Sequence, residues 1–152
     1  MTVPAFQDRL AEAASEAGED DPDAFRNVDV QFAYSLLRRD GERRYPFRAS
    51  RDRHATMAAM DDHVTDRIDL LAVKLSGDLS DGDNAVFRIG DGSQTTDHYA
   101  VLTKESALNR ELAAAEYGAV LAFENVLVLW NDDEAAYNLV VDGETVVDRL
   151  SG

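Results

Sequence analysis

The sequence predicts an α+β fold of two layers, in which helices pack on one face of a mostly antiparallel sheet. Several segments alternate apolar and polar residues, which is the period of a strand with one buried face. Three further segments repeat apolar residues at helical spacing. Asp-Gly pairs, which favour tight hairpin turns, separate strand-like segments at positions 40–41, 91–92 and 142–143. Together these features predict hairpins covered by helices.

A first helix is predicted over residues 4–17. Its apolar residues share one face: Phe6, Leu10, Ala13 and Ala17. Thr2 is placed to cap this helix and Gly18 to end it. The acidic loop at 19–23 holds no residue that would enter a core. We therefore interpret residues 1–23 as a helical arm plus an acidic loop that attach loosely to the rest of the domain.

The clearest strand pair is a hairpin of residues 28–37 and 42–47 around the first Asp-Gly pair. Apolar residues alternate along the first strand, and a two-residue loop determines which residues of the second strand lie opposite them. Tyr34 then faces Phe47, so the apolar residues of both strands share one face. This agreement between pattern and register supports the predicted hairpin.

A second helix is predicted over residues 51–67, with Ser50 as its cap. Its apolar stripe consists of Met57, Met60, Val64 and Ile68. The elements that follow are, in chain order, a strand at 70–75, a polar turn at 78–84, a hairpin of 85–89 with 98–103 around Asp91-Gly92, and a helix at 105–117 that ends at Gly118.

The last predicted strands are 119–123 and 126–130, which form a hairpin or one bulged strand, and 136–141 with 145–150, a hairpin around Asp142-Gly143. The order hairpin, helix, strand thus occurs twice, over 28–75 and 85–130, which predicts a duplicated unit. Trp130 lies either in the core or on an exposed sheet edge that pairs with a second subunit of a homodimer.

Charge is the most distinctive property of the composition. The 152 residues, interpreted as a single domain over 1–152, contain 30 Asp and Glu against 15 Lys and Arg, a formal net charge of −15. Arg outnumbers Lys by 13 to 2, and Asp outnumbers Glu by 20 to 10. Such an acidic surface resembles that of proteins from salt-in halophilic archaea, in which molar salt screens the repulsion between carboxylates. In dilute buffer the same repulsion is expected to loosen the fold.

The sequence also bears on the cellular compartment. The chain has no Cys, which excludes disulfides, thiolate metal sites and cysteine nucleophiles. Its first residues lack the basic and apolar regions of a signal peptide. The longest apolar run, at 119–130, is interrupted by Glu124 and Asn125 and is too short to span a bilayer. We therefore expect a cytoplasmic protein.

The sharpest candidate for function is a local reversal of charge within this acidic chain. Seven of the 15 cations fall within residues 38–53, where Tyr45 and Phe47 are interleaved. These cations are Arg38, Arg39, Arg43, Arg44, Arg48, Arg51 and Arg53. In the predicted hairpin Arg38 lies opposite Arg43, a like-charge pair that an anion between them would stabilise.

Three interpretations of this arginine-rich segment are open. The arginines pair with carboxylates of the chain itself, such as Asp40, Glu42 and Asp52. Alternatively, they contact an acidic protein partner or a second subunit, or they bind nucleic acid or a phosphate ligand. The acidic remainder of the chain repels a polyanion, and salt weakens phosphate binding steeply, so a protein contact is favoured over nucleic acid.

No set of residues predicts catalysis, a metal site or a cofactor. His54 and His63 point to opposite faces of the predicted second helix. Three Asp residues within 78–83 suggest a calcium loop, but its twelfth position is Ile89 rather than Glu. Phosphate-cradle, dinucleotide and hydrolase motifs are missing from the sequence. We therefore expect a non-enzymatic binding module that uses no cofactor.

Overall fold

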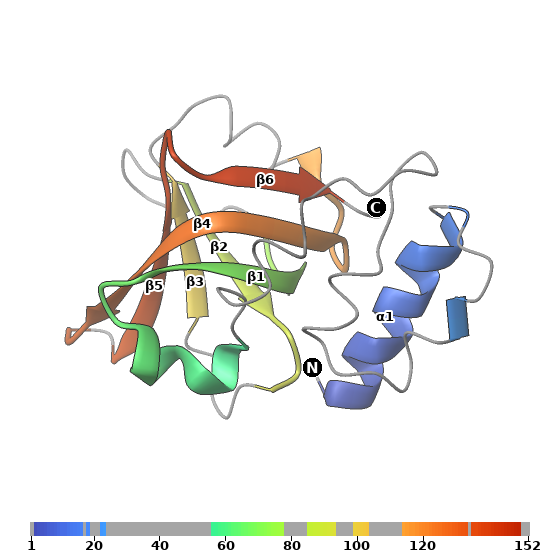
Figure 1. Ribbon diagram of the computed structural model, residues 1–152, viewed down its shortest axis with the longest axis horizontal. Coiled ribbons are helices and arrows are strands. Elements are labelled where there is room, and N and C mark those ends of the chain that lie inside the picture. The colour runs from blue at the N-terminus through green and yellow to red at the C-terminus, as the bar shows by residue number, and fades with distance from the viewer. Residues whose placement is uncertain are drawn as a thin grey trace.

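The computed structural model describes residues 2–16, 18, 22–23, 56–77, 85–93, 99–103, 114–133 and 135–149. The described elements are helix α1 (Val3–Glu16), the 3₁₀ helix η3 (Met57–His63) and strands β1 (Arg67–Lys74), β2 (Ala85–Gly90), β3 (Tyr99–Thr103), β4 (Val120–Asn131), β5 (Ala136–Val141) and β6 (Val146–Arg149) (Figure 1). Several predicted elements lie outside the described residues: the hairpin at 28–47, the start of the second helix at 51–55, the polar turn at 78–84 and most of the helix at 105–117. The combination of helices with a mostly antiparallel sheet confirms the predicted α+β class.

The sheet closes on itself to form a five-stranded barrel. β1 pairs with β2, β2 with β3, β3 with β5, β5 with β4, and β4 with β1 again. All these pairs are antiparallel except β3 with β5, and β6 extends the sheet beside β4 (Figure 1). The predicted two-layer arrangement is therefore not confirmed, because the pairing of β1 with β4 places the main core inside a closed sheet. The duplication stays a prediction, since most of its first unit lies outside the described residues.

The interior of the barrel is the main hydrophobic core. Alternate residues of β1, β2, β4 and β5 point into it, as Phe87 and Ile89 of β2 do. Phe123 of β4 is fully buried in the same cluster. Met57 and Met60 join it from η3, which covers one end of the barrel. The barrel is thus filled by side chains rather than open.

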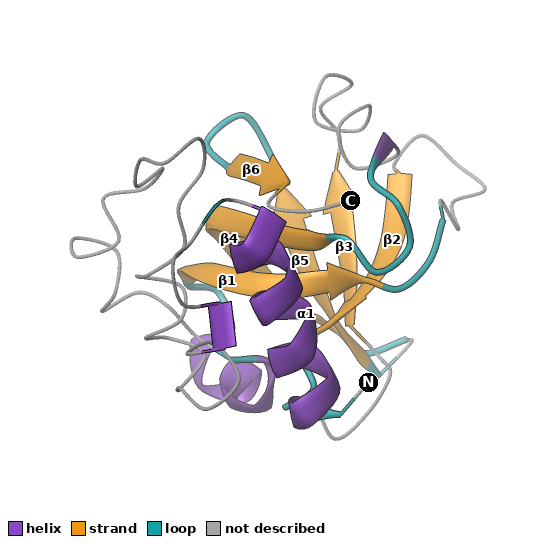
Figure 2. Ribbon diagram, turned by 90° about the vertical axis from the view of Figure 1, so that its right-hand side faces the viewer, coloured by secondary structure: helices purple, strands orange, loops and turns teal. Residues whose placement is uncertain are grey.

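Helix α1 packs on the outside of the barrel, across β1 and β4 (Figure 2). As predicted, Thr2 caps the helix, because its Oγ1 accepts a hydrogen bond from the backbone N of Ala5 at 3.2 Å. Phe6 and Leu10 of α1 are fully buried. Their cluster on the sheet consists of Leu71 and Val73 of β1 and Val120 and Ala122 of β4. β1 and β4 are therefore buried on both faces where α1 crosses them.

The second predicted helix ends earlier than the sequence suggested. η3 ends at His63, Val64 then takes an extended ψ of 127°, and Thr65 takes a positive φ of 74°. These backbone angles end the helical run, and β1 follows directly. Met57 and Met60 are buried as predicted, but Ile68 reaches the same core from a strand.

The last strands pair differently from the prediction. Residues 120–131 form one bulged strand rather than a hairpin, and Asn125 within it has a positive φ of 64°. β5 and β6 both run antiparallel to β4, β5 beside residues 127–131 and β6 beside residues 121–124. The hairpin predicted at Asp142-Gly143 is therefore wrong, because the 12-residue β4 offers both strands a partner along the same edge. β2 and β3 do pair antiparallel as predicted, but residues 91–98 join them.

Candidate functional site

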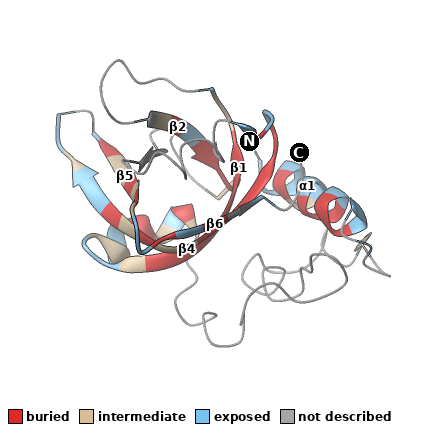
Figure 3. Cartoon of the chain, turned by 90° about the horizontal axis from the view of Figure 1, so that it is seen from above, coloured by how far each residue is buried: buried red, intermediate tan, exposed pale blue. Residues whose placement is uncertain are grey.

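The outer face of β2 and β3 is one candidate binding surface. The neighbours of Arg88 along β2 point into the barrel, so Val86 and Arg88 lie on the outside. Val86 is half-buried and Arg88 is exposed. Figure 3 shows that β2 carries both buried and exposed positions. The two residues that follow β1 hold the backbone of Arg88 in place. The N of Arg88 donates to Ser76 Oγ and its carbonyl accepts from Leu75 N, both at 2.8 Å. A rigid strand thus presents the guanidinium of Arg88 to solvent.

Arg88 differs from the other described cations in its surroundings. Each of the others is engaged: Arg9 with Glu12, Arg67 with Asp142 and Glu144, Lys74 with the carbonyl of Ala115, and Arg149 with the carbonyl of Ala114. Within the described part of the chain, no carboxylate forms an ion pair with Arg88. Its guanidinium is therefore available to an anion from outside the described residues.

A second candidate surface lies at the turn between β4 and β5. Trp130, the single tryptophan of the chain, is 44% exposed near the end of β4. Its ring meets that of Tyr137 on β5 edge to face, with 4.8 Å between centroids and 64° between planes. The indole Nε1 donates a hydrogen bond to Asp132 Oδ1 in the turn. Trp130 and Tyr137 form an aromatic rim in which these two contacts orient an indole that stays partly open to solvent.

Carboxylates lie in the turn after Trp130 and on η3. Asp132 and Asp133 are exposed in the turn after β4, and Asp61 and Asp62 are exposed on η3. The pKa of Tyr137 is raised above its ordinary value, first by burial and then by the negative charges of Asp61 and Asp62. Negative charge from two separate elements thus reaches the aromatic rim.

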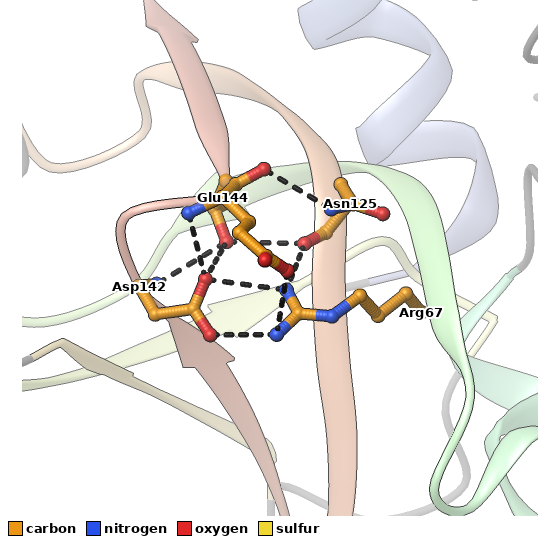
Figure 4. Close-up of polar contacts among 5 residues, drawn as sticks. Arg67, Asn125, Asp142 and Glu144 are labelled. Carbon is orange, nitrogen blue, oxygen red and sulfur yellow. Dashed lines mark hydrogen bonds and ion pairs between the residues drawn. The ribbon is translucent and has the colours of Figure 1, made fainter.

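An ion-pair cluster at the bulge of β4 holds β1, β4 and the turn before β6 together (Figure 4). Arg67 Nη2 lies 2.7 Å from Asp142 Oδ2, and its Nη1 donates to Asp142 Oδ1 at 3.2 Å and to the carbonyl of Asn125 at 3.0 Å. Glu144 Oε2 lies 3.3 Å from the same guanidinium. Thr145 Oγ1 donates to the carbonyl of Asn125 at 3.1 Å. The cluster stabilises the turn that replaces the predicted hairpin.

This cluster makes stability depend on pH in the acid range. The guanidinium of Arg67 holds the pKa of Asp142 at about 2, below its ordinary value. Because the pKa is depressed in the folded state, the contribution is complete above the ordinary pKa of Asp and is lost as the pH falls from about 4 towards 2. We expect Asp142→Asn to lower the free energy of unfolding near neutral pH by about 1 kcal/mol, since solvent screens the pair. Urea titration across this pH range would measure the loss.

The matched control for that prediction removes one negative charge from the exposed turn after β4. Asp133→Asn changes the net charge equally, but Asp133 lies outside the Arg67 cluster. The difference between wild type and Asp142→Asn should shrink in acid, whereas the difference between wild type and Asp133→Asn should stay small throughout. If the free energies of unfolding of wild type and Asp142→Asn differ by the same amount down to acid pH, the stability does not depend on the ionisation of Asp142, which contradicts the prediction.

The arginine-rich segment lies outside the described residues. This holds for every residue that the sequence analysis assigned to binding: Arg38, Arg39, Arg43, Arg44, Tyr45, Arg48, Arg51 and Arg53. His54 also lies outside them, and His63 Nδ1 lies 3.6 Å from Asp66 Oδ2. Among the described residues, no three His, Asp or Glu side chains converge to hold a metal ion. None of the helices in the described ranges is long and apolar enough to cross a membrane.

Sequence reasoning missed Arg88 and placed Trp130 only in part. Arg88 is an isolated cation in a strand, and the burial of its neighbours Phe87 and Ile89 was the signal that could have placed it outside. Trp130 is not in the core, and it lies beyond Leu127, where the pairing of β4 with β1 ends, so the predicted edge contact with a second subunit stays a prediction. Its half-exposed position depends on where β4 ends within the barrel.

Several solved structures resemble this chain at low sequence identity. The p204 HINb domain has a TM-score of 0.53 at 10% identity, over 81% of this chain and 56% of that chain. Schizosaccharomyces pombe Pot1pC bound to ssDNA has a TM-score of 0.49 at 7% identity, over 63% of this chain and 85% of that one. The OB domain of MM0293 from Methanosarcina mazei has a TM-score of 0.42 at 18% identity, over 59% and 77%. The likeness to the p204 HINb domain concerns the fold alone. Independently of it, the strand order describes a small barrel of five strands, which is the architecture of OB folds.

The part of the sequence that forms the barrel also matches a defined protein family. The family described as "Domain of unknown function (DUF8157) C-terminal domain" matches residues 58–150, which include all six described strands. No curated protein matches the sequence. Because the matched residues make up more than half of the chain, the protein belongs to the family described as "Domain of unknown function (DUF8157) C-terminal domain".

Proposed function

We propose that this protein is a non-enzymatic module that binds single-stranded nucleic acid on the outer face of β2 and β3. The observation that carries the proposal is the exposed guanidinium of Arg88 on that face, without a carboxylate partner among the described residues. OB barrels bind oligonucleotides on the face of their second and third strands. The described helices occupy other surfaces here, since α1 packs on β1 and β4 and η3 joins the barrel interior. The surface used by this fold for oligonucleotides therefore carries a suitably charged residue.

The arginine-rich segment supplies the remaining positive charge in this proposal. Its seven guanidinium groups belong to Arg38, Arg39, Arg43, Arg44, Arg48, Arg51 and Arg53, and Tyr45 lies among them. Guanidinium groups form paired hydrogen bonds with phosphate, and aromatic rings stack on bases. The net charge of −15 opposes the approach of a polyanion, so binding depends on this local excess of arginine.

The proposal includes a cytoplasm of high salt as the working environment. In molar salt the Debye length is about 3 Å, so the acidic surface no longer repels a phosphate chain at a distance. The same salt weakens the contribution of phosphate contacts. Stacking and direct hydrogen bonds should therefore carry a larger share of the binding free energy than they do in proteins of dilute cytoplasm.

Charge reversal at Arg88 tests the proposal directly. We expect Arg88→Glu to weaken binding of a labelled single-stranded DNA or RNA about tenfold at low KCl, because one charge-assisted contact to phosphate becomes repulsive. Fluorescence anisotropy at low and at molar KCl would measure the change, with circular dichroism to establish folding at each salt. The double variant Arg43→Glu/Arg44→Glu should weaken binding further.

Arg9→Glu is the matched control, because it makes the same change of charge on α1, away from the outer face of β2 and β3. Equal losses for Arg88→Glu and Arg9→Glu would show that only net charge matters and would contradict the assigned face. An absence of binding by folded wild-type protein at every salt would remove the nucleic-acid proposal. The arginine-rich segment would then be assigned to a protein partner or a second subunit.

A further inference from the structure

We propose that the aromatic rim of Trp130 and Tyr137 is a docking surface for an arginine-bearing peptide segment of a partner protein. This surface is carried by β4 and β5 at the turn between them, whereas the proposed function uses the outer face of β2 and β3. The inference therefore stands or falls independently of nucleic-acid binding. Its starting point is the ring of Trp130, which is 44% exposed and supported by Tyr137.

The indole of Trp130 is oriented rather than loosely attached. Tyr137 supports it edge to face at 4.8 Å and is itself packed against the barrel core. Asp132 accepts the indole N–H, so the polar edge of the ring is already satisfied. What the rim offers a partner is therefore the π surface of the ring. Exposed and pre-oriented tryptophans dominate binding energy in many protein interfaces, because little conformational entropy is lost when they are buried.

The charge around the aromatic rim selects the partner. Asp132 and Asp133 follow Trp130 in the turn, while Asp61 and Asp62 act on Tyr137 from η3. Four carboxylates around an aromatic surface repel phosphate and attract cations. The rim is thus complementary to a cationic peptide and poorly suited to a nucleic-acid strand.

Arginine fits this surface better than lysine. A planar guanidinium stacks on an indole face and at the same time donates paired hydrogen bonds to a carboxylate. The ammonium group of lysine is a compact, strongly hydrated charge. It cannot stack on the indole as a plane and does not form the paired hydrogen bonds with a carboxylate. The occupant inferred for the rim is therefore a segment with at least one arginine, presented to Trp130 between the turn carboxylates and those of η3.

The sole tryptophan gives this surface its own spectroscopic signal. We expect a capped hexa-arginine peptide to change the fluorescence of Trp130 in a saturable manner, and capped hexalysine to bind several-fold more weakly. A labelled hexa-arginine peptide should bind Trp130→Ala about tenfold more weakly than wild type by anisotropy, because the aromatic anchor is lost. Trp130→Phe keeps an aromatic face and should retain part of the affinity, while circular dichroism checks that both variants fold.

A pair of charge variants separates the rim from the general acidity of the chain. Asp61→Asn/Asp62→Asn should weaken the peptide about threefold at low KCl and have little effect in molar KCl. Asp8→Asn/Glu16→Gln removes the same charge from α1 and should leave the affinity unchanged. Equal weakening by both pairs, or equal affinity for Trp130→Ala and wild type, would overturn the proposal. So would a response of Trp130 to oligothymidine but not to hexa-arginine, which would instead assign the rim to nucleic acid.

Discussion

Gly92→Ala is expected to lower the free energy of unfolding by about 2–4 kcal/mol. Gly92 has a φ of 79°, a left-handed conformation that residues with a Cβ adopt at a cost. A Cβ on Gly92 would also meet the carbonyl group of Thr2 and lie 2.7 Å from Val3 N, so backbone atoms rather than a flexible side chain would have to move. Chemical unfolding in molar KCl, followed by circular dichroism, would measure the loss.

Substitutions at two other glycines separate the cost of the left-handed backbone from the cost of the close contact with Thr2 and Val3. Gly18 has a φ of 82°, but no atom lies within 4 Å of the position that a Cβ would occupy there, so Gly18→Ala tests the left-handed backbone alone. Gly77 has neither restriction, and Gly77→Ala should be close to neutral. We expect the order Gly92, Gly18, Gly77 from most to least destabilised. An effect of Gly92→Ala no larger than that of Gly18→Ala would show that the start of α1 moves aside at little cost.

The position of Gly92 explains why its substitution should propagate. Asp91 beside it is buried, and its Oδ2 accepts a hydrogen bond from the N of Met57 at 2.9 Å. Ser93 Oγ accepts one from the N of Ala58 at 3.0 Å. The segment after β2 therefore joins the start of α1 and the start of η3 to the barrel. A shift at Gly92 would loosen both helices together.

Phe123→Ala is expected to lower the free energy of unfolding by about 3–5 kcal/mol, the largest effect of any substitution considered. Phe123 is fully buried inside the barrel, and β4 pairs there with β1 on one side and β6 on the other. α1 covers the opposite face of β4 through the neighbouring Ala122. Because β4 has a strand on each edge and a helix on its outer face, the neighbours of Phe123 cannot move in to fill the cavity that the substitution leaves. Urea unfolding would give both the midpoint and the slope.

Leu129→Ala on the same strand is the matched control for Phe123→Ala. Leu129 is 38% exposed, so truncation removes less buried surface and leaves no closed cavity, and about 1 kcal/mol is expected. A similar loss at both positions would mean that the interior of the barrel repacks around the missing ring. That outcome would contradict a tightly packed closed barrel.

Local features of the structure were predictable from the residues themselves. Thr2 caps α1 because a side-chain oxygen one residue before a helix can accept a free backbone N–H. Met57 and Met60 are buried because their spacing places them on one face of a helical turn, whether that turn is α or 3₁₀. Gly118 adopts a left-handed φ of 87°, but the helix predicted to end there is not formed at residues 115–117, so Gly118 lies in a turn before β4. The cap and the buried methionines depend on atoms only a few residues apart.

The candidate surfaces could be anticipated only in part. Alternation along β2 places Arg88 on the outside, but the lack of a described carboxylate beside it depends on how distant segments pack. The aromatic rim requires the register of β4 with β5, which pairs Trp130 with Tyr137, and the placement of η3 near them. The ion pair of Arg67 with Asp142 joins residues 75 positions apart, beyond any local pattern.

The α+β class, the positions of most described strands and the faces that they bury follow from local periodicity, so the residues alone predict them. Which strands become neighbours depends instead on how the whole chain packs. An Asp-Gly pair favours a turn, but it does not outweigh a long buried strand that can pair with two others along one edge, so β5 and β6 both joined β4. β1 likewise pairs with β4 because the other edge of that long strand is available to it. Backbone hydrogen bonds and burial reward whichever edge is available, and alternation along one strand carries no information about its partner.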